Sequence, residues 1–410
     1  MAQITERESQ PRAADLSFSS LLKRAKELTP FFSSQATAGE AQGSLTEATV
    51  NALRDGGFFS LWIPRQLGGA ELLPVEMLEI TEALSYADGS TGWVVMATQV
   101  AMGTAAAYLD PSASAALFGR RLTLIAGQGA PNGRAVVEGR GFRLTGKWNY
   151  GSGLLHSEYI HTGAVIYENG APRMIPGTRV PETRIFIVPV SAAELKGNWD
   201  VLGLKATGSV DYDINGVLVP ENYTHFHSAR TALTGGNLYK LGIQGLGAVC
   251  HTAFALGQGR RMLDELAALA GAEKGRPALI TPGGGGESFQ EQFGHAEAKL
   301  RAARAFAVET QADIAAGLDQ GKDVSTRQFT LSRLSLNHAT SALAEVCTFA
   351  YKYGGGVALR NGTLQRCFRD MYSGTQHITT QPAILRECGR ELLGMAPGKV
   401  WGPRGLIDPI

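Results

Sequence analysis

One histidine near the C-terminal end, His377, is the residue of this chain best suited to proton chemistry. It follows the stretch Arg369-Asp370-Met-Tyr-Ser-Gly-Thr-Gln, and two threonines come shortly after it. A neutral imidazole can accept the proton of a phenol or orient an indole N–H, and its ordinary pKa of about 6.5 makes it neutral near physiological pH. The alternative is that His377 only caps or packs the last helix. We predict that His377 is catalytic and contacts the substrate.

A second group of residues, Lys147-Trp148-Asn-Tyr150-Gly-Ser152-Gly153, is suited to holding a flat ring. Two aromatic side chains and one hydroxyl stand between glycines, directly after an apparent β-strand. Trp148 or Tyr150 can pack on a planar heterocycle while Ser152 offers it a hydrogen bond, and glycines let the backbone approach closely. The plain alternative is a strand that ends in a tight turn. We predict that Trp148, Tyr150, Ser152 and Gly153 bind a cofactor.

A third group, Leu202-Gly-Leu-Lys-Ala-Thr207-Gly208-Ser209, forms a small loop rich in hydroxyl groups before another apparent strand. An ordinary β-turn would have a similar composition. The hydroxyls of Thr207 and Ser209, with the flexible backbone of Gly208 between them, also suit the same planar cofactor. We therefore predict a cofactor contact at these three residues.

Other catalytic motifs are missing from the sequence. The segment Gly127-Gln-Gly129-Ala-Pro131-Asn132 resembles the dinucleotide fingerprint GxGxxG, but its last glycine is absent and Pro131 would break the helix that must follow. The chain has no GxxxxGK[ST], HExxH or GxSxG motif and no metal-spaced group of histidines and cysteines. The sequence therefore predicts neither a nicotinamide-binding βαβ unit nor a metal site.

Composition limits the class of protein. The chain has 410 residues, 44% of them hydrophobic and only 18% charged, with a formal net charge of +1. This balance gives no electrostatic reason to expect a nucleic acid or an anionic membrane as partner. The four cysteines have no CxxC spacing, which fits reduced cytosolic thiols, and no stretch reaches the roughly 20 apolar residues of a membrane span. We predict a cytoplasmic protein with part of its surface buried between subunits.

The periodicity of apolar residues divides the chain into three domains. Helical spacing in residues 1–120 predicts a helical domain, with segments near 91–118 rich in Ala, Gly and Met that suit packing on all sides. Short β-rich runs separated by turns in residues 121–232 predict an antiparallel barrel or sandwich. Helical spacing over 243–271, 289–317, 325–353 and 376–394 predicts a bundle in residues 233–410. The fold class is thus α+β.

Taken together, these segments resemble the acyl-CoA dehydrogenase superfamily of flavoproteins across nearly the whole chain. The resemblance rests on the order and spacing of five stretches: Gly57–Gly69, Gly89–Trp93, Gly146–His156, Leu202–Pro220 and Arg369-Asp370. It implies an N-terminal helical domain, a central antiparallel β-barrel or sandwich, and a C-terminal four-helix bundle. It also implies a homotetramer that holds flavin between the β-domain and the bundle, with Arg369 among the cofactor-binding residues.

Within this superfamily, the form Trp-x-Tyr-x-Ser-Gly with a downstream histidine is similar to the two-component aromatic monooxygenases. The resemblance implies FADH2 or FMNH2 supplied by a separate flavin reductase, reaction with O2 to a C4a-hydroperoxyflavin, and transfer of one oxygen atom to an aromatic ring. Ser152 would then hydrogen-bond near flavin N5, while Trp93 and His377 would bind the substrate. An indole-type substrate is preferred, and a phenol-type substrate remains open.

Two alternatives use the same scaffold. An acyl-CoA dehydrogenase needs a carboxylate base, but Ile378 occupies the main position for that base. The other position used in the superfamily falls near Gly247, with no acid within that turn. Because a general base must reach the proton that it removes, these absences disfavour a dehydrogenase. An N-hydroxylase of amino sugars, similar to the nitrososynthases, would also lack the glutamate.

Overall fold

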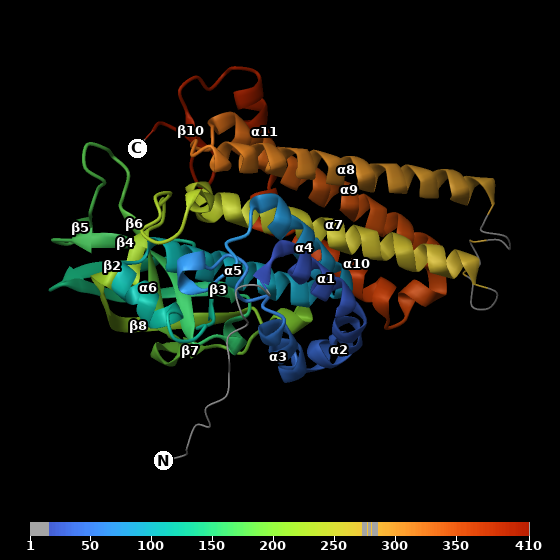
Figure 1. Cartoon of the computed structure of the whole chain (residues 1–410), viewed down its shortest axis with the longest axis horizontal. Helices are drawn as coiled ribbons and strands as arrows, with labels where there is room; N and C mark the ends of the chain where they lie inside the picture. The colour runs from blue at the N-terminus through green and yellow to red at the C-terminus, as the bar shows by residue number, and fades with distance from the viewer. Residues whose placement is uncertain (1–15, 273–276, 278–279, 281–285, 410) are drawn as a thin grey trace, which may run out of the picture.

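The computed structural model describes residues 16–272, 277, 280 and 286–409, and its helices and strands are gathered in different parts of the molecule (Figure 1). The first part of the chain is helical up to residue 118. Its α-helices are α1 (Phe18–Glu27), α2 (Thr29–Gln42), α3 (Glu47–Asp55), α4 (Pro74–Ala87), α5 (Gly89–Tyr108) and α6 (Pro111–Phe118). The structure confirms the predicted order of helices, then strands, then helices.

Helix α5 is the inner helix of this first part. Its N-terminus is capped by Asp88, whose carboxylate accepts hydrogen bonds of 2.8 Å from both the backbone N–H and the hydroxyl of Thr91. Nearly every residue of α5 is buried. Its many small side chains let neighbouring elements approach from all sides, as its composition predicts. The cap therefore fixes where the helix starts and so where Trp93, one turn along, is held.

The middle of the chain forms one nine-stranded sheet, ordered β7-β8-β3-β2-β4-β6-β9, with β1 and β5 paired to β4. The strands are β1 (Ile125–Ala126), β2 (Gly133–Glu138), β3 (Gly141–Gly151), β4 (Tyr159–Glu168), β5 (Ala171–Pro172), β6 (Thr183–Pro189), β7 (Ala193–Leu195), β8 (Val210–Pro220) and β9 (Thr224–Phe226). It has its own hydrophobic core, centred on Trp148, Phe186 and Tyr212.

The sheet is mixed, which corrects the prediction of a wholly antiparallel one. β2 and β3 form an antiparallel pair, but β4 runs parallel to both β1 and β2. The reason is topological: β8 occupies the outer side of β3, so the chain turns back after β3 and adds β4 on the far side of β2. Two reversals of direction then leave β4 parallel to β2.

The last part of the chain is a helical bundle with long helices that lie side by side and extend away from the sheet (Figure 1). The helices are α7 (Gly242–Gly271), α8 (Glu287–Asp319), α9 (Thr326–Leu359), α10 (Thr363–Gly374) and α11 (Pro382–Leu392), followed by the short strands β10 (Val400–Trp401) and β11 (Leu406–Ile407). None of the helices within the described ranges is long and apolar enough to cross a membrane.

The sequence predicted one helix over residues 376–394, but the structure places a break there. Helix α10 ends at Gly374, and α11 begins only at Pro382, where the fixed φ of proline suits the first position of a helix. A short 3-10 turn, Ile378–Thr380, fills the gap. His377 lies just before this turn, so its backbone is extended and not helical. Arg369-Asp370 lies inside α10 and does not open the final helix.

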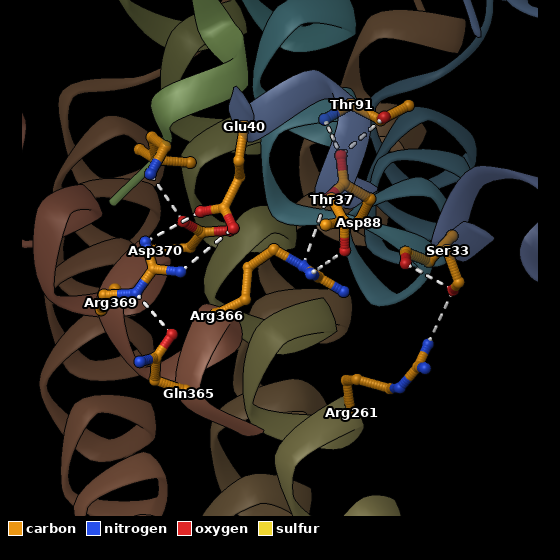
Figure 2. A network of polar contacts seen from close by, with 12 residues as sticks. Ser33, Thr37, Glu40, Asp88, Thr91, Arg261, Gln365, Arg366, Arg369 and Asp370 are labelled. Carbon is orange, nitrogen blue, oxygen red and sulfur yellow. Dashed lines mark hydrogen bonds and ion pairs between the residues drawn. The ribbon is translucent and has the colours of Figure 1, made fainter. Parts of the chain in front are cut away.

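A buried carboxyl group on α10, that of Asp370, joins this helix to the loop before β8 (Figure 2). Its Oδ1 accepts a hydrogen bond of 2.6 Å from the backbone N–H of Leu204. Gly203 makes this approach possible, because a Cβ at that residue would lie 2.3 Å from the backbone of Arg369. The Arg369 guanidinium donates hydrogen bonds of 2.8 and 3.1 Å to the two carboxylate oxygens of Glu40 on α2. Helices α2 and α10 and the loop are therefore held together.

The charge of Asp370 is costly in this position. Burial raises its pKa to about 7, and the negative charge of Asp88 acts in the same direction. The Arg366 guanidinium lies 4.0 Å from the Asp88 carboxylate and hydrogen-bonds to Thr37, so it offsets part of the charge on the Asp88 side (Figure 2). Among the described residues, the second carboxyl oxygen of Asp370 has no hydrogen-bond partner. A protonated Asp370 is therefore favoured in the folded protein over a wide pH range.

Replacing Asp370 by asparagine should make the protein less sensitive to rising pH. The folded-state pKa of about 7 lies above the ordinary value of 3.8, so the group stabilises the fold at low pH and this contribution is lost as pH rises toward and past 7. The amide of the Asp370→Asn variant cannot ionise and keeps an oxygen for Leu204. We expect the melting temperature of Asp370→Asn, relative to wild type, to rise between about pH 4 and 7, corresponding to up to about 1.4 kcal/mol per pH unit, and to level off above pH 7.

The control for this experiment is Asp200→Asn, which changes an exposed carboxylate between β7 and β8. Its melting temperature should follow that of wild type at every pH. If the curves of Asp370→Asn and wild type against pH are parallel, Asp370 does not titrate in the folded protein over this range and the assignment is wrong.

Candidate active site

A chain of buried hydroxyl groups joins the two loops that the sequence singled out. The indole N–H of Trp93 donates to Ser152 Oγ at 3.1 Å, and Ser152 Oγ lies 2.7 Å from Ser209 Oγ. Ser209 Oγ lies 2.7 Å from Thr207 Oγ1, which donates to the Leu204 carbonyl at 2.7 Å. The structure therefore brings together three elements: α5, the end of β3 and the loop before β8.

The two ends of this chain fix its direction. An indole N–H can only donate and a carbonyl oxygen can only accept. Because the Thr207 hydroxyl proton goes to the Leu204 carbonyl, the Ser209 proton must go to Thr207 and the Ser152 proton to Ser209. Ser152 then has used its proton and one lone pair, and its remaining lone pair is an acceptor. The site therefore presents an acceptor, and not a donor, at Ser152.

Backbone geometry keeps the neighbourhood of Ser152 open. Gly153 follows it with a φ of +80°, a conformation that L side chains rarely adopt, and its N–H donates to the Thr207 carbonyl at 3.0 Å. Gly208 has a φ of +55° within the facing loop. Tyr150 also has a positive φ of 63°, and 64% of the residue is exposed. Its ring is free to pack against a planar ligand.

Trp148, unlike Tyr150, does not have an exposed ring. It is only 1% exposed, its ring stacks on Tyr212 at 5.5 Å, and its indole N–H donates to the Gly163 carbonyl at 2.9 Å. Regular alternation along β3 would place Trp148, Tyr150 and Ser152 on one face. The register with β8 shifts between Trp148 and Gly151, and the positive φ of Tyr150 falls within that shift. The strand therefore turns there, and Trp148 belongs to the sheet core.

Arg369 is similarly engaged within the protein. Besides Glu40 (Figure 2), its guanidinium donates to the Leu202 carbonyl at 3.0 Å. These contacts hold the loop that carries Thr207 and Ser209. The geometry gives Arg369 a supporting part behind the loop in place of the predicted direct contact with a cofactor.

His377 lies beside Trp93, and their ring centroids are 6.0 Å apart. Its Nδ1 is 2.8 Å from Thr379 Oγ1 and also lies within 3.4 Å of the Thr379 backbone nitrogen. The Thr379 backbone N–H donates to Nδ1 in a long hydrogen bond and favours the tautomer with its proton on Nε2. In the other tautomer, Nδ1 gives up this long contact and donates to the Thr379 hydroxyl, which leaves Nε2 to accept from a ligand. Burial lowers the pKa of His377 to about 4. The ring is thus neutral at physiological pH.

A second imidazole in the site, that of His251 on α7, was missed by the sequence analysis. Its ring centroid is 3.9 Å from that of His377 and 5.0 Å from that of Trp93. Burial lowers its pKa well below the ordinary value, and a charge on His377 would lower it further. The signal was present in the sequence, because His251 is one helical turn after Gly247. Only acidic residues were considered in that turn.

No carboxylate is close to the imidazole pair in the described part of the chain. Ile378, at the expected position of a dehydrogenase base, is 52% exposed and apolar. The nearest acids along α7 pair with arginines: Asp264 with Arg260 at 2.7 Å and Glu265 with Arg261 at 2.8 Å. The site is therefore built from neutral hydroxyls, indole and imidazoles. It suits hydrogen bonding to an uncharged ring and transfer of a single proton.

Two protein-family models match the chain. The model of the acyl-CoA dehydrogenase N-terminal domain matches residues 25–113, and that of the acyl-CoA dehydrogenase C-terminal domain matches residues 249–382. Together they cover more than half of the chain. The chain is 29% identical to an indole-3-acetate monooxygenase of Pseudomonas putida over 87% of this chain and 90% of that protein.

Two further relatives have names that describe part of an oxygenase system. A flavin-dependent monooxygenase oxygenase subunit, HsaA, of Mycobacterium tuberculosis is 28% identical over 92% of this chain and 96% of its own. The crystal structure of HsaA superposes with a TM-score of 0.85 and 26% identity, covering 95% of this chain and 100% of that chain. The oxygenase component of an FADH2-dependent resorcinol hydroxylase from Rhizobium is 25% identical over 92% of this chain and 95% of its own.

Proposed function

The chain belongs to the acyl-CoA dehydrogenase superfamily, and we propose that within it this protein is the oxygenase component of a two-component, flavin-dependent monooxygenase acting on an aromatic substrate. The observation that carries the proposal is that Trp93 contacts both Ser152, through its indole N–H, and the imidazoles of His251 and His377, through its ring, with no carboxylate of the described residues acting on the imidazoles. A dehydrogenase would need a base that these residues do not supply.

The hydrogen-bond acceptor at Ser152 fits a reduced flavin. Reduced flavin carries an N–H at N5, and the remaining lone pair of Ser152 can accept from it, whereas an oxidised flavin presents an acceptor at the same atom. Tyr150 supplies an exposed ring for packing, and the positive φ angles of Gly153 and Gly208 shape the two loops that meet at Ser152. FADH2 or FMNH2, when bound, supplies the reaction with O2 that provides the transferred oxygen atom.

His377 handles the substrate proton in this proposal. As a ring carrying an O–H or N–H gains oxygen, that group becomes more acidic, and Nε2 of the neutral imidazole can take its proton. Thr379 holds Nδ1 and so keeps the ring oriented. Since the pKa of His377 is about 4, the neutral form is present at all physiological pH values. Trp93 contributes a buried flat surface beside the imidazole.

The proposal includes a separate flavin reductase, a homotetramer and a cytoplasmic location. The relatives are named as an oxygenase subunit or component, which supports a separate reductase. Several large apolar side chains are exposed on the single chain and support burial against other copies; those near the C-terminal end are Leu359, Leu392, Leu393 and Met395. All four cysteines are free and buried, which is consistent with a reducing compartment. Sedimentation analysis measures the oligomeric state.

The purified protein should not use NADH by itself. We expect hydroxylated product and O2 consumption only when a flavin reductase with NADH, or chemically reduced FAD or FMN, is added. The measurement is NADH oxidation and product formation with and without the reductase. Rapid NADH oxidation by the protein and FAD alone would contradict the proposed division of labour.

Ser152→Ala should uncouple flavin oxidation from hydroxylation. The change removes the acceptor for the flavin N–H and interrupts the hydroxyl chain, and one neutral hydrogen bond is worth about 1 kcal/mol, or roughly fivefold. We expect more H2O2 per product formed and weaker binding of reduced flavin, with the melting temperature little changed. Ser34→Ala, which removes an exposed hydroxyl on α2, is the control. An unchanged H2O2-to-product ratio would assign Ser152 a structural role only.

His377→Ala should lower the rate of aromatic hydroxylation by about 10²-fold or more, the usual scale for loss of a general base. Reduced-flavin binding should be retained, because Ser152 and Tyr150 are untouched. In the wild type, the loss of kcat/KM on acidification should be centred near pH 4 and not near 6.5, since burial lowers the pKa of His377. His338→Ala, at an exposed histidine on α9, is the control. A wild-type hydroxylation rate in His377→Ala would remove the central residue from the mechanism.

A further inference from the structure

The rings of His251 and His377 are in close, tilted contact. Their centroids are 3.9 Å apart with an interplanar angle of 32°. In the described part of the chain, no hydrogen bond joins the two rings or occupies either nitrogen of His251. Ring nitrogens lie in the plane of the imidazole, so in such a contact they point outward and not at each other. Three nitrogens are therefore left for a ligand: both of His251 and Nε2 of His377.

Aromatic side chains surround this pair on one side. Trp93 meets His251 edge-on at 70° and His377 at 76°. Phe254, on the same helix as His251, meets Trp93 at 4.9 Å and 87°. Such edge-to-face contacts fix the rings without using their nitrogens. The indole N–H of Trp93 is directed at Ser152, so it does not compete for the imidazole nitrogens.

The electrostatic surroundings of the pair are unusually simple. Burial is the only cause that lowers the pKa of His377, and for His251 the only addition is the charge of His377 itself. No acidic or cationic side chain of the described residues acts on either ring. A carboxylate brought to this position would lose hydration without gaining a charged partner, which is strongly unfavourable. An uncharged ring with an N–H or O–H meets no such cost.

We propose that His251 is a second substrate-contacting residue, and that His251 and His377 together form a two-imidazole site selective for an uncharged aromatic bearing a ring N–H or O–H. The inference rests on the proposed function and adds a residue and a substrate class to it. His377 Nε2 accepts the substrate proton: the N–H or O–H bond of the substrate breaks, and an N–H bond forms on the imidazole. An indole N–H, which is a single donor, is shared between Nε2 of His377 and a nitrogen of His251, whereas a phenol O–H donates to His377 while its oxygen accepts from His251. The close contact between the two rings also holds His377 in place.

The pair also limits the site to one added proton. Once His377 is protonated, its charge disfavours protonation of the adjacent His251 ring. A neutral His251 therefore stays available to hydrogen-bond the substrate while its neighbour carries the proton. An indole or phenol satisfies the site with one polar group, whereas a substrate with a carboxylate near this group does not.

The test uses three probes that differ at one position each: indole, 1-methylindole without the ring N–H, and indole-3-acetate with an added carboxylate. Their affinities for the full-length protein with reduced FAD are measured anaerobically by calorimetry. We expect wild type to bind indole at least about fivefold more tightly than either of the others, as for one neutral hydrogen bond. Equal or tighter binding of indole-3-acetate, or no measurable binding of indole, overturns the inference.

The variants separate the nitrogens of His251 from its bulk. His251→Phe keeps a flat ring and should weaken indole binding about fivefold while leaving 1-methylindole unchanged. His251→Gln returns an amide oxygen that can accept from the indole N–H and should recover part of the indole affinity, and it replaces the Phe variant if that one does not fold. His295→Asn, at an exposed histidine on α8, should bind all probes as wild type does. Wild-type indole binding by His251→Phe overturns the role of His251.

A kinetic measurement distinguishes failure of this inference from failure of the proposed function. With reduced FAD and O2, His251→Phe should raise KM for indole more than it lowers kcat, because His377 still accepts the proton. If wild type forms no hydroxylated product from any aromatic probe, the monooxygenase function fails, and the anaerobic affinities still decide whether the imidazole pair selects uncharged N–H ligands. If wild type hydroxylates indole and His251→Phe does so with unchanged KM, only the present inference fails.

Discussion

The hydrogen bond from the Leu204 backbone to the buried carboxyl of Asp370 is the constraint on which the site geometry depends. It fixes the loop before β8 against α10, and that loop supplies Thr207 and Ser209 to the hydroxyl chain. The same helix leads directly to His377. One carboxyl group therefore sets the distance between the residues that face the cofactor and the residue that faces the substrate. Burying the charged form of Asp370 there costs free energy, and the raised pKa of this carboxyl reflects that cost.

Much of this arrangement could be predicted from the sequence, because it depends on local patterns. Helical and strand periodicities predicted the order of the three parts, and glycines beside hydroxyls marked the loops that carry Ser152, Thr207 and Ser209. Trp93 and His377 also meet as expected. The order of the three parts is confirmed, because residue type and spacing along the chain determine where helices, strands and turns fall. The assignment of these loops to a cofactor stays a prediction.

The remaining features depend on contacts that the sequence does not display. Trp148 and Tyr150 are separated by a shift of register, which ordinary alternation along a strand cannot reveal. Arg369 was assigned to the cofactor because its partner, Glu40, is more than three hundred residues away. The role of His251 was not predicted for the same reason. It depends on the contact with the ring of His377, which lies on another element 126 positions later in the sequence.

Charged side chains and neutral side chains lie on different sides of the loop before β8. Behind the loop, charged groups pair over short distances: Arg369 with Glu40 at 2.8 Å and Arg366 with Asp88 at 4.0 Å. In front of it, neutral groups alone face the ligand position among the described residues. An ionised group at the front would keep a fixed charge beside a ring whose own charge must change during oxygen transfer. Imidazoles held neutral by burial can instead take up a proton only when the substrate becomes acidic, so the protonation of the site follows the reaction and not the pH of the medium.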